Sequence, residues 1–375
     1  MSDPQRAPAL ETLPPDVVAL ADFERHAQAR MTPEAWAFLN GGAADELTLR
    51  ANRAAWDALQ LMPRVLRDLS GGHTRVRLLG REMPWPVLLA PIAYQRLAHA
   101  DGELACAYAA AAQGAGVVLS AQSSMPMEPV AQALRAEPQR GPLWFQLYWR
   151  DDPEFMRALL RRVEAAGYEA LVLTVDAPVN GARDRERRAA FKLPDDIRAV
   201  NLGGLKRPID LKPGQSPLFD GLMPRAATWA EIEWLRRESA LPLLLKGVCH
   251  PEDALRARAL GVAGLVVSNH GGRTLDTVPP TTALLPPLRA ALGEDFTLLV
   301  DGGIRRGTDV LKALALGADA VLLGRPYVHA LAAAGALGVA HALRLLRDEL
   351  EIAMALCGCR SLDEVGPHLL APGIR

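Results

Sequence analysis

The amino-acid sequence predicts an α/β fold: a single (β/α)₈ TIM barrel with an N-terminal helical segment and a long loop insert after strand 4. Three observations lead to this prediction. Short apolar runs recur along the chain, segments with helical spacing separate them, and polar residues follow nearly every run. Runs that are apolar throughout are typical of parallel strands covered on both faces. A doubly wound sheet is the alternative, but it does not require eight near-equal βα units.

Eight apolar runs are predicted to form the strands of the barrel. They are Val87–Ala90, Val117–Leu119, Trp144–Leu147, Leu171–Val175, Leu243–Leu245, Leu265–Val267, Leu298–Val300 and Val321–Leu323. The segments between them supply the outer helices of βα units. These segments include Glu103–Gln113, Pro153–Ala166, Pro251–Leu260 and Thr308–Leu316.

The chain is expected to divide into an N-terminal helical segment, residues 1–86, and the barrel, residues 87–375. A helical stretch, Thr32–Leu59, is expected to pack against the barrel and close its mouth. The gap between the fourth and fifth strands is much longer than the others, and its excess, about residues 180–228, is rich in Arg, Lys, Pro and Gly. An insertion there lies on the active-site face, which predicts a lid; a disordered surface loop is the alternative.

Composition excludes several classes of protein. Lys and Arg number 42 against 43 Asp and Glu, so the net charge of −1 gives no reason to expect nucleic acid or an anionic membrane as a partner. The four cysteines match neither a zinc site nor a disulfide framework, and no metal is expected. The sequence begins without a signal peptide, and no run reaches the ~18 apolar residues of a membrane span. These features predict a cytoplasmic protein.

Polar residues follow nearly every predicted strand, and in a barrel these positions meet at one rim. In chain order they are Pro91-Ile92-Ala93, Ser120, Gln146 and Tyr148, Thr174 and Asp176, Lys246, Ser268-Asn269-His270, Asp301-Gly302-Gly303 and Gly324-Arg325. One polar strand end would carry no information, whereas eight that converge on one rim predict a functional site.

The last two strand ends are predicted to bind phosphate. Gly303 and Gly324 let backbone N–H groups approach an anion, and Arg305 and Arg325 can hold it through paired hydrogen bonds. The loops after strands seven and eight are the usual phosphate site of this fold. The alternative is that the glycines only form tight turns and the arginines are solvated.

Three other strand ends predict catalytic groups. Lys246 follows an apolar strand, where it is either a Schiff-base nucleophile or a fixed cation beside a ligand that gains negative charge. His270 is a candidate general base because Arg273, three residues further on, can bind a substrate carboxylate. Asp176, at another strand end, could orient the imidazole and stabilise its protonated form.

The segment Ser268-Asn269-His270-Gly271-Gly272-Arg273-Thr274-Leu275-Asp276 closely resembles the signature of the FMN-dependent α-hydroxy acid oxidase and dehydrogenase family. Further motifs that are similar to the family's, in the family's order, extend from about residue 20 to 360. They are Gly42-Ala43-Ala44-Asp45-Glu46, Ala90-Pro91, Trp144–Tyr148, Leu173–Pro178, Leu245–Val248 and Asp301–Gly317.

The resemblance implies that FMN lies across the barrel mouth and that a 2-hydroxy acid is oxidised to a 2-oxo acid. The implied catalytic residues are His270, Asp176, Tyr148 and Arg273, with His270 as the base and Arg273, helped by Arg183, on the substrate carboxylate. The implied cofactor-binding residues are Pro91, Ala93, Ser120, Gln146, Thr174, Lys246, Ser268, Asp301, Gly302, Gly303, Arg305, Gly324 and Arg325. Family resemblance also implies a homo-oligomer, either a tetramer or an octamer.

Three departures from the family pattern concern substrate binding. Phe38 stands in place of a usual tyrosine, Tyr94 in place of a common methionine, and Gln122 in place of a frequent tryptophan. Phe38 with Tyr94 resembles the mandelate and hydroxymandelate oxidase branch. We therefore expect a larger, aromatic (S)-2-hydroxy acid to be preferred over glycolate or lactate. Ala93, which is common in the family's oxidases, favours O₂ as electron acceptor with release of H₂O₂.

Several alternatives stay open. Within the family they are an L-lactate or glycolate oxidase, a quinone-linked dehydrogenase and a lactate 2-monooxygenase. Another FMN barrel, such as a type 2 isopentenyl diphosphate isomerase, is disfavoured by His270 and Arg273. A phosphosugar aldolase would use Lys246 as a Schiff-base nucleophile without a flavin. A catalytically silent ligand-binding barrel would have no need of these residues together.

Overall fold

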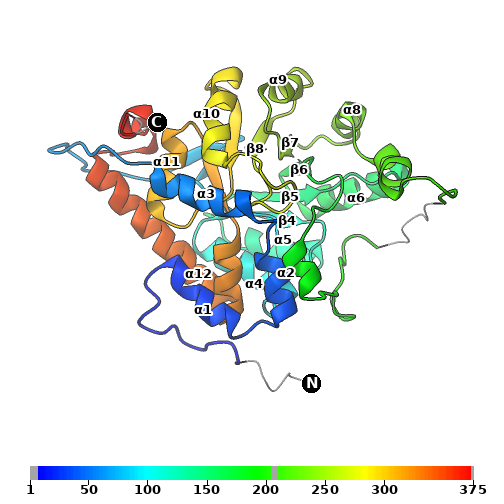
Figure 1. Cartoon of the computed structure of the whole chain (residues 1–375). Helices are drawn as coiled ribbons and strands as arrows, with labels where there is room; N and C mark the ends of the chain where they lie inside the picture. The colour runs from blue at the N-terminus through cyan, green and yellow to red at the C-terminus, as the bar shows by residue number, and fades with distance from the viewer. Residues whose placement is uncertain (1–6, 204–209, 373–375) are drawn as a thin grey trace.

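The computed structural model describes residues 7–203 and 210–372, and its centre is a closed barrel of eight parallel strands (Figure 1). The barrel strands are β3 (Val87–Leu89), β4 (Gly116–Ser120), β5 (Leu143–Leu147), β6 (Ala170–Thr174), β7 (Leu243–Lys246), β8 (Gly264–Val267), β9 (Thr297–Val300) and β10 (Ala320–Leu323). Each strand pairs with the next one along the chain, and β10 pairs with β3 to close the ring. The predicted (β/α)₈ barrel is confirmed.

The strands form because their side chains are buried on both faces. Side chains alternate between the two faces of a strand, so one apolar residue from the middle of each strand fills the barrel interior. These interior residues are Leu88, Val118, Trp144, Val172, Leu244, Val266, Leu299 and Leu322. Their neighbours in sequence, such as Leu89 and Leu119, belong to the separate core between the barrel and its helices.

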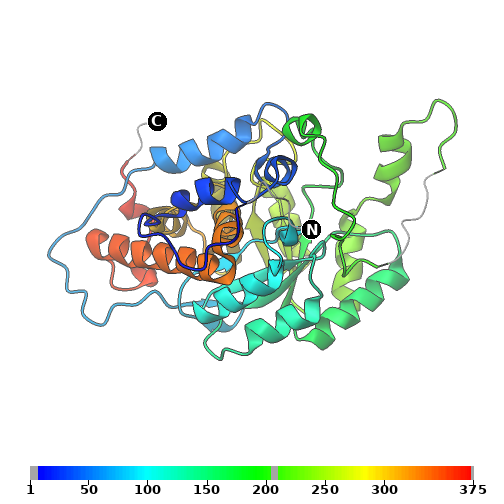
Figure 2. The same ribbon diagram turned by 90° about the horizontal axis from the view of Figure 1, so that it is seen from below.

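Helices surround the barrel (Figure 2). They are α4 (Gly102–Ala112), α5 (Met127–Arg135), α6 (Pro153–Ala166), α8 (Trp229–Glu238), α9 (Pro251–Ala259), α10 (Thr281–Leu292), α11 (Gly307–Ala315) and α12 (Arg325–Cys357). The four segments predicted from helical spacing are found as α4, α6, α9 and α11. Helix α6 begins where the Asp152 carboxylate accepts a hydrogen bond from the Phe155 amide, and it ends at Gly167 in the left-handed conformation.

The N-terminal segment supplies helices α1 (Phe23–Gln28), α2 (Pro33–Asn40) and α3 (Leu47–Ala58). The prediction of one helical stretch over residues 32–59 was therefore wrong. Helix α2 ends at Gly41, where an added Cβ would lie only 2.6 Å from the Ala37 carbonyl oxygen. Helix α1 packs against α12, and α3 packs against α10 at the mouth of the barrel (Figure 1).

An antiparallel hairpin closes the other end of the barrel. Its strands are β1 (Val76–Leu78) and β2 (Arg81–Met83). Leu78 and Met83 are buried and join the apolar cluster that fills the barrel interior. The hairpin therefore covers the barrel interior at the N-terminal ends of the strands.

Within its described residues, the predicted insert after β6 contains three short helical elements. They are α7 (Asp184–Arg188), a π-helix (Pro217–Leu222) and a 3₁₀ turn (Met223–Arg225). Helix α7 packs against α2. Residues 204–209 of the predicted insert lie outside the described residues.

Among the described residues, α12 alone is long and apolar enough, by length and composition, to cross a membrane, although His329 and His341 interrupt its apolar sequence. The most apolar window of α12 is 67% buried within the protein. Helical geometry is interrupted at Ala334 and Gly335, and α12 packs against α1, α4 and α11. This packing accounts for the apolar composition of α12, because a core helix must bury its surface.

Candidate active site

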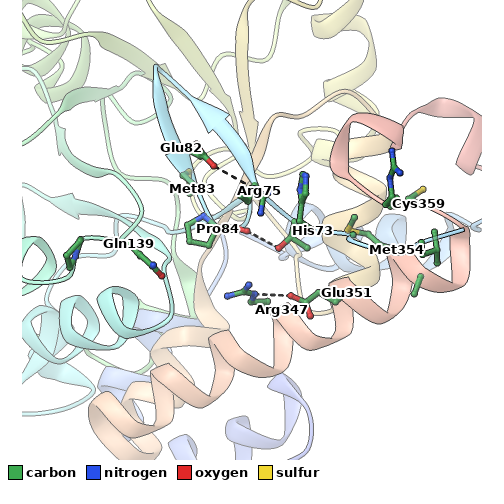
Figure 3. A pocket seen from close by; sticks show the side chains of 16 residues that line it. His73, Arg75, Glu82, Met83, Pro84, Gln139, Arg347, Glu351, Met354 and Cys359 are labelled. Atoms are coloured by element: carbon green, nitrogen blue, oxygen red, sulfur yellow. Dashed lines mark hydrogen bonds and ion pairs between the residues drawn. The ribbon is translucent and has the colours of Figure 1, made fainter.

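Two large cavities lie at opposite ends of the barrel. One, of about 1480 Å³ including space open to solvent, lies between the β1–β2 hairpin and α12 and is lined by residues such as His73, Glu82 and Arg347 (Figure 3). The other, of about 1200 Å³ on the same measure, opens where the barrel strands end. Barrel enzymes carry their chemistry at the C-terminal ends of the strands. We therefore take the second cavity, although smaller, as the candidate active site.

This active-site cavity brings together most of the predicted site residues. Its lining includes Phe38, Pro91, Ala93, Ser120, Gln122, Gln146, Tyr148, Thr174, Arg183, Lys246, His270, Arg273, Asp301, Gly302, Gly303, Arg305, Gly324 and Arg325. Three predicted residues lie behind this lining and contact it: Asp176 contacts His270, Ser268 contacts Lys246, and Tyr94 contacts Phe38.

His270 and Asp176 form a close pair. The Nδ1 atom of His270 lies 2.9 Å from Oδ1 of Asp176, which follows β6. A carboxylate at this distance places the ring proton on Nδ1 and leaves Nε2 free to accept a proton. Burial and the nearby Lys246 ammonium lower the pKa of His270, while Asp176 opposes the shift. His270 is therefore neutral near pH 7 and available as a base.

Lys246 is a fixed cation at the end of β7. Its Nζ donates a hydrogen bond to Ser268 Oγ at 2.9 Å and lies 3.2 Å from Asp301 Oδ2. Burial acts to lower the pKa of Lys246, but the Asp301 and Asp176 carboxylates outweigh it and raise this pKa above its ordinary value. Ser268 Oγ also accepts from the His270 backbone amide at 3.0 Å. Ser268 thus connects the cation to the base.

Two arginines form a cationic end of the cavity beside His270. Arg273 Nη1 donates to the Gly41 carbonyl at 2.7 Å, and Arg183 Nε donates to the Arg273 carbonyl at 3.4 Å. Burial lowers the pKa of Arg273, as do the neighbouring Arg325 and Arg183 cations. A substrate carboxylate would relieve this repulsion, because it supplies the missing negative charge.

An aromatic wall stands beside this cationic end. Phe38 lies under the Arg273 guanidinium, 5.4 Å from it, and stacks on Phe191 with ring centroids 4.5 Å apart. The Tyr94 ring lies 6.2 Å from that of Phe38. Phe191 belongs to the insert and was not among the predicted site residues. Tyr148 also lines the cavity, and burial raises the pKa of its phenol, so it stays a hydrogen-bond donor.

A row of hydrogen-bonded side chains crosses the ends of β4, β5 and β6. Ser120 Oγ donates to Gln146 Oε1 at 3.1 Å, and Gln146 Nε2 donates to Thr174 Oγ1 at 3.0 Å. Ser120 Oγ also accepts from the Gln122 amide at 3.1 Å. These buried groups offer a polar face to a planar ligand that carries donors and acceptors along one edge.

Glycine is required where β9 leads into the predicted phosphate site. Gly302 and Gly303 have φ values of +90° and +88°, which side chains rarely adopt. A Cβ on Gly303 would lie 2.7 Å from both the Asn52 carbonyl oxygen and the Trp56 ring. Gly324, after β10, has open space where its Cβ would be. Glycine at 303 therefore allows α3 to pack closely on this turn, and the open space at Gly324 leaves the backbone there accessible to an anion.

Helix α3 holds this turn through residues that were not predicted. Trp56 Nε1 donates to the Gly302 carbonyl at 2.7 Å, and Arg53 Nη1 donates to the Gly303 carbonyl at 2.6 Å. The side-chain amides of Asn52 and Asn269 exchange two hydrogen bonds of 2.8 Å. The only indication in the sequence was the general expectation that this helical segment closes the mouth.

The cavity fits an anionic cofactor such as FMN. Its lining holds six cations, Arg53, Arg183, Lys246, Arg273, Arg305 and Arg325, and one carboxylate, Asp301. The buried Nε of Arg325 has no hydrogen-bond partner among the described residues. Burial and the nearby Arg305 cation lower the pKa of Arg325 to about 10. A phosphate between these arginines would satisfy the free donor and neutralise the charge.

Comparison with known proteins leads to the same chemistry. A family model described as FMN-dependent dehydrogenase matches residues 27–372. L-lactate oxidase from Alicycliphilus denitrificans is 47% identical over 96% of this chain and 98% of its own length. 4-Hydroxymandelate oxidase from Amycolatopsis orientalis is 44% identical over 92% and 96%, respectively. The crystal structure of mandelate oxidase with (S)-2-phenylpropionate matches with a TM-score of 0.84 at 43% identity, over 94% of this chain and 98% of that one. The chain belongs to the FMN-dependent dehydrogenase family.

Proposed function

We propose that the protein uses FMN to oxidise an (S)-2-hydroxy acid to the 2-oxo acid, with O₂ as electron acceptor and H₂O₂ as the second product. The observation that carries this proposal is the pairing of a neutral base, His270, with a cation for a carboxylate, Arg273, in one cavity. The substrate loses two electrons and two protons, and O₂ takes up the two electrons and the two protons to give H₂O₂.

When bound, FMN supplies the acceptor for the two electrons that leave the α-carbon. His270 Nε2 takes up a proton that the substrate releases, and the Asp176 carboxylate at 2.9 Å stabilises the resulting imidazolium. Arg273 and Arg183 bind the substrate carboxylate, and the Tyr148 hydroxyl donates a hydrogen bond to the substrate. Lys246 stays protonated and faces the part of the cavity where negative charge develops.

The aromatic wall supports a substrate with an apolar, aromatic side chain. Phe38 lines the cavity and offers no hydroxyl to a small polar acid, and Phe191 supports it from outside the lining by stacking on it with ring centroids 4.5 Å apart. Aromatic rings bury large apolar area and prefer stacked or edge contacts with other rings. Relatives include L-lactate oxidases and, at slightly lower identity, a 4-hydroxymandelate oxidase, a difference too small to decide the substrate. The wall favours a mandelate-like acid over lactate.

Three further parts of the proposal rest on family resemblance or on sequence features. Ala93 lines the cavity and supports O₂ as acceptor over a quinone. A homo-oligomeric assembly is proposed from the same resemblance, and a cytoplasmic location is proposed from the sequence features given above. Light scattering on the purified protein and cell fractionation test these two points.

A Schiff-base aldolase is the alternative that the site disfavours. An amine must be deprotonated to attack a carbonyl. Lys246 is paired with Asp301 at 3.2 Å, and its pKa is raised, so its amine stays protonated. Borohydride treatment in the presence of candidate aldehydes would leave the chain unmodified under the proposed function.

Steady-state kinetics with (S)-mandelate, L-lactate and glycolate tests the proposal. Formation of 2-oxo acid and H₂O₂ in equal amounts supports the oxidase reaction, and we expect the highest kcat/KM with mandelate. A much higher kcat/KM with lactate or glycolate would contradict the substrate preference but not the reaction. If the enzyme oxidised none of the three acids, the proposed reaction itself would be contradicted.

A further inference from the structure

One backbone oxygen accepts hydrogen bonds from an arginine at each end of the active-site cavity. The Gly41 carbonyl accepts a hydrogen bond from Arg273 Nη1 at 2.7 Å and another from Arg325 Nη2 at 3.1 Å. Arg273 stands at the substrate end, and Arg325 stands at the phosphate end. The position of this oxygen therefore affects how both guanidinium groups are held.

The residue before Gly41 is fastened to α12. His329 follows Arg325 by four residues, so the two side chains lie on the same face of α12. The Nε2 atom of His329 lies 2.6 Å from Asn40 Oδ1, and Asn40 Nδ2 donates to the Trp36 carbonyl at 3.2 Å. Because the Asn40 amide nitrogen is used by Trp36, its oxygen must accept, and His329 Nε2 carries the proton.

Packing alone does not account for a histidine at this position. The His329 ring is buried and stacks on Trp36 with centroids 5.3 Å apart, a contact that phenylalanine could also make. Its Nδ1 is buried without a hydrogen-bond partner among the described residues, which costs free energy. Burial and the Arg305 and Arg325 cations lower the pKa of His329 to about 3, so the ring is neutral. The Nε2–H group is the feature that distinguishes histidine from phenylalanine here.

We propose that His329 is a positioning residue: through Asn40 it fixes the Gly41 carbonyl between Arg273 and Arg325, and so sets both substrate affinity and FMN retention. His329 is not part of the cavity lining, so it acts through the turn and not by contact. The inference rests on the proposed function, because it assigns the two arginines to substrate carboxylate and cofactor phosphate.

The test compares His329→Phe with His329→Gln in the purified, full-length enzyme. Phenylalanine keeps the ring but removes the N–H, and we expect KM for the hydroxy acid to rise about tenfold, as for loss of one buried hydrogen bond. The Kd of the apoprotein for FMN, measured by flavin fluorescence, should rise about tenfold as well. The value of kcat at saturating FMN and substrate should stay within about twofold, because the pair of His270 and Asp176 is untouched. Glutamine places an N–H near the position of Nε2 and should restore KM and Kd.

A matched control comes from the same helix. His341 on α12 also bonds the N-terminal segment, with Nε2 3.0 Å from the Val17 carbonyl oxygen, and it does not line the cavity. His341→Phe should lower Tm at most and leave KM and the FMN Kd unchanged. An equal rise of KM and Kd in His341→Phe would overturn the inference, because it would show a general effect of weakening α12.

Two other outcomes separate the inference from the proposed function. A folded His329→Phe enzyme with wild-type KM and FMN Kd would overturn the inference while leaving the proposed function intact. A wild-type protein that neither binds FMN nor oxidises hydroxy acids would overturn the proposed function first. If His329→Phe fails to fold, Asn40→Ala removes the same hydrogen bond from the other side and must give the same rise in KM and Kd.

Discussion

Asp176 Oδ1 lies 2.9 Å from His270 Nδ1, and this contact sets the protonation state of the base. The second carboxylate oxygen of Asp176 is buried without a hydrogen-bond partner among the described residues. Burial acts to raise the pKa of Asp176, but the hydrogen bond with His270 and the charges of His270 and Lys246 lower it below the ordinary value. The Asp176 carboxylate is therefore ionised at neutral pH, and its Oδ1 faces the imidazole ring of His270.

Replacing Asp176 with asparagine should lower kcat by on the order of 10³-fold, because a neutral amide cannot stabilise the imidazolium. KM should change little, since Arg273 and Arg183 are untouched. Stopped-flow reduction of the flavin under anaerobic conditions measures the effect directly. A folded Asp176→Asn enzyme with kcat within a few-fold of the wild type would contradict the assigned role.

The pH dependence of kcat/KM should show an acid limb below pH 6.5, the ordinary pKa of histidine. Burial and Lys246 lower the pKa of His270, so its neutral form persists to lower pH, and activity rises as pH increases through that pKa. Asp176 alone opposes this shift with a negative charge, so Asp176→Asn should move the limb to still lower pH. A limb that moves upward in the variant would show that His270 is not the titrating base.

Lys246→Met should reduce both stability and activity. It leaves the Asp301 carboxylate buried without its counter-charge, and we expect the free energy of unfolding to fall by about 3 kcal/mol. The value of kcat should fall about 10²-fold, because a fixed cation beside developing charge is lost. The double variant Lys246→Met/Asp301→Asn should regain much of the stability, measured by urea unfolding, but not the activity. Recovery of kcat in the double variant would contradict a direct catalytic role for Lys246.

Arg325→Met should weaken FMN binding about 30-fold but leave riboflavin binding unchanged, because only FMN carries a phosphate for Arg325 to hold. Fluorescence titration of the apoprotein with each flavin gives the two Kd values. Arg344→Met is the matched control, since Arg344 lies on the same helix and pairs with exposed Asp348. An equal weakening of riboflavin binding would show that Arg325 does not contact the phosphate.

Phe38→Tyr should shift substrate preference toward smaller acids. The added hydroxyl extends from the edge of the ring that stacks on Phe191, and it offers a hydrogen bond that an aromatic substrate side chain cannot use. We expect the ratio of kcat/KM for (S)-mandelate to that for L-lactate to fall about tenfold. An unchanged ratio would mean that the aromatic wall does not select the substrate.

The barrel and most of the cavity lining could be predicted from the sequence for one physical reason. Parallel strands covered on both faces are apolar throughout, so the first polar residue marks the strand end, and all strand ends share one rim. Lys246 and His270 were found in this way, and the structure places both in one cavity. Asp176 was found too, although it lies behind the lining.

Contacts made by the N-terminal segment could not be predicted, because they depend on long-range packing. Nothing in the periodicity of residues 47–58 indicates that Asn52 pairs with Asn269 or that Trp56 bonds the Gly302 carbonyl. The β1–β2 hairpin has strands of three residues each, which are too short for a clear alternation. The break between α2 and α3 was missed although Gly41 and Gly42 mark it, because the flanking spacing is helical on both sides.

Anaerobic mixing of the purified protein with (S)-mandelate tests the central claim most directly. We predict a yellow protein whose flavin absorbance bleaches as one equivalent of 2-oxo acid forms per flavin. On admission of air the absorbance should return with release of one equivalent of H₂O₂. A flavin that stays oxidised with (S)-mandelate and with every other 2-hydroxy acid tried would contradict the account.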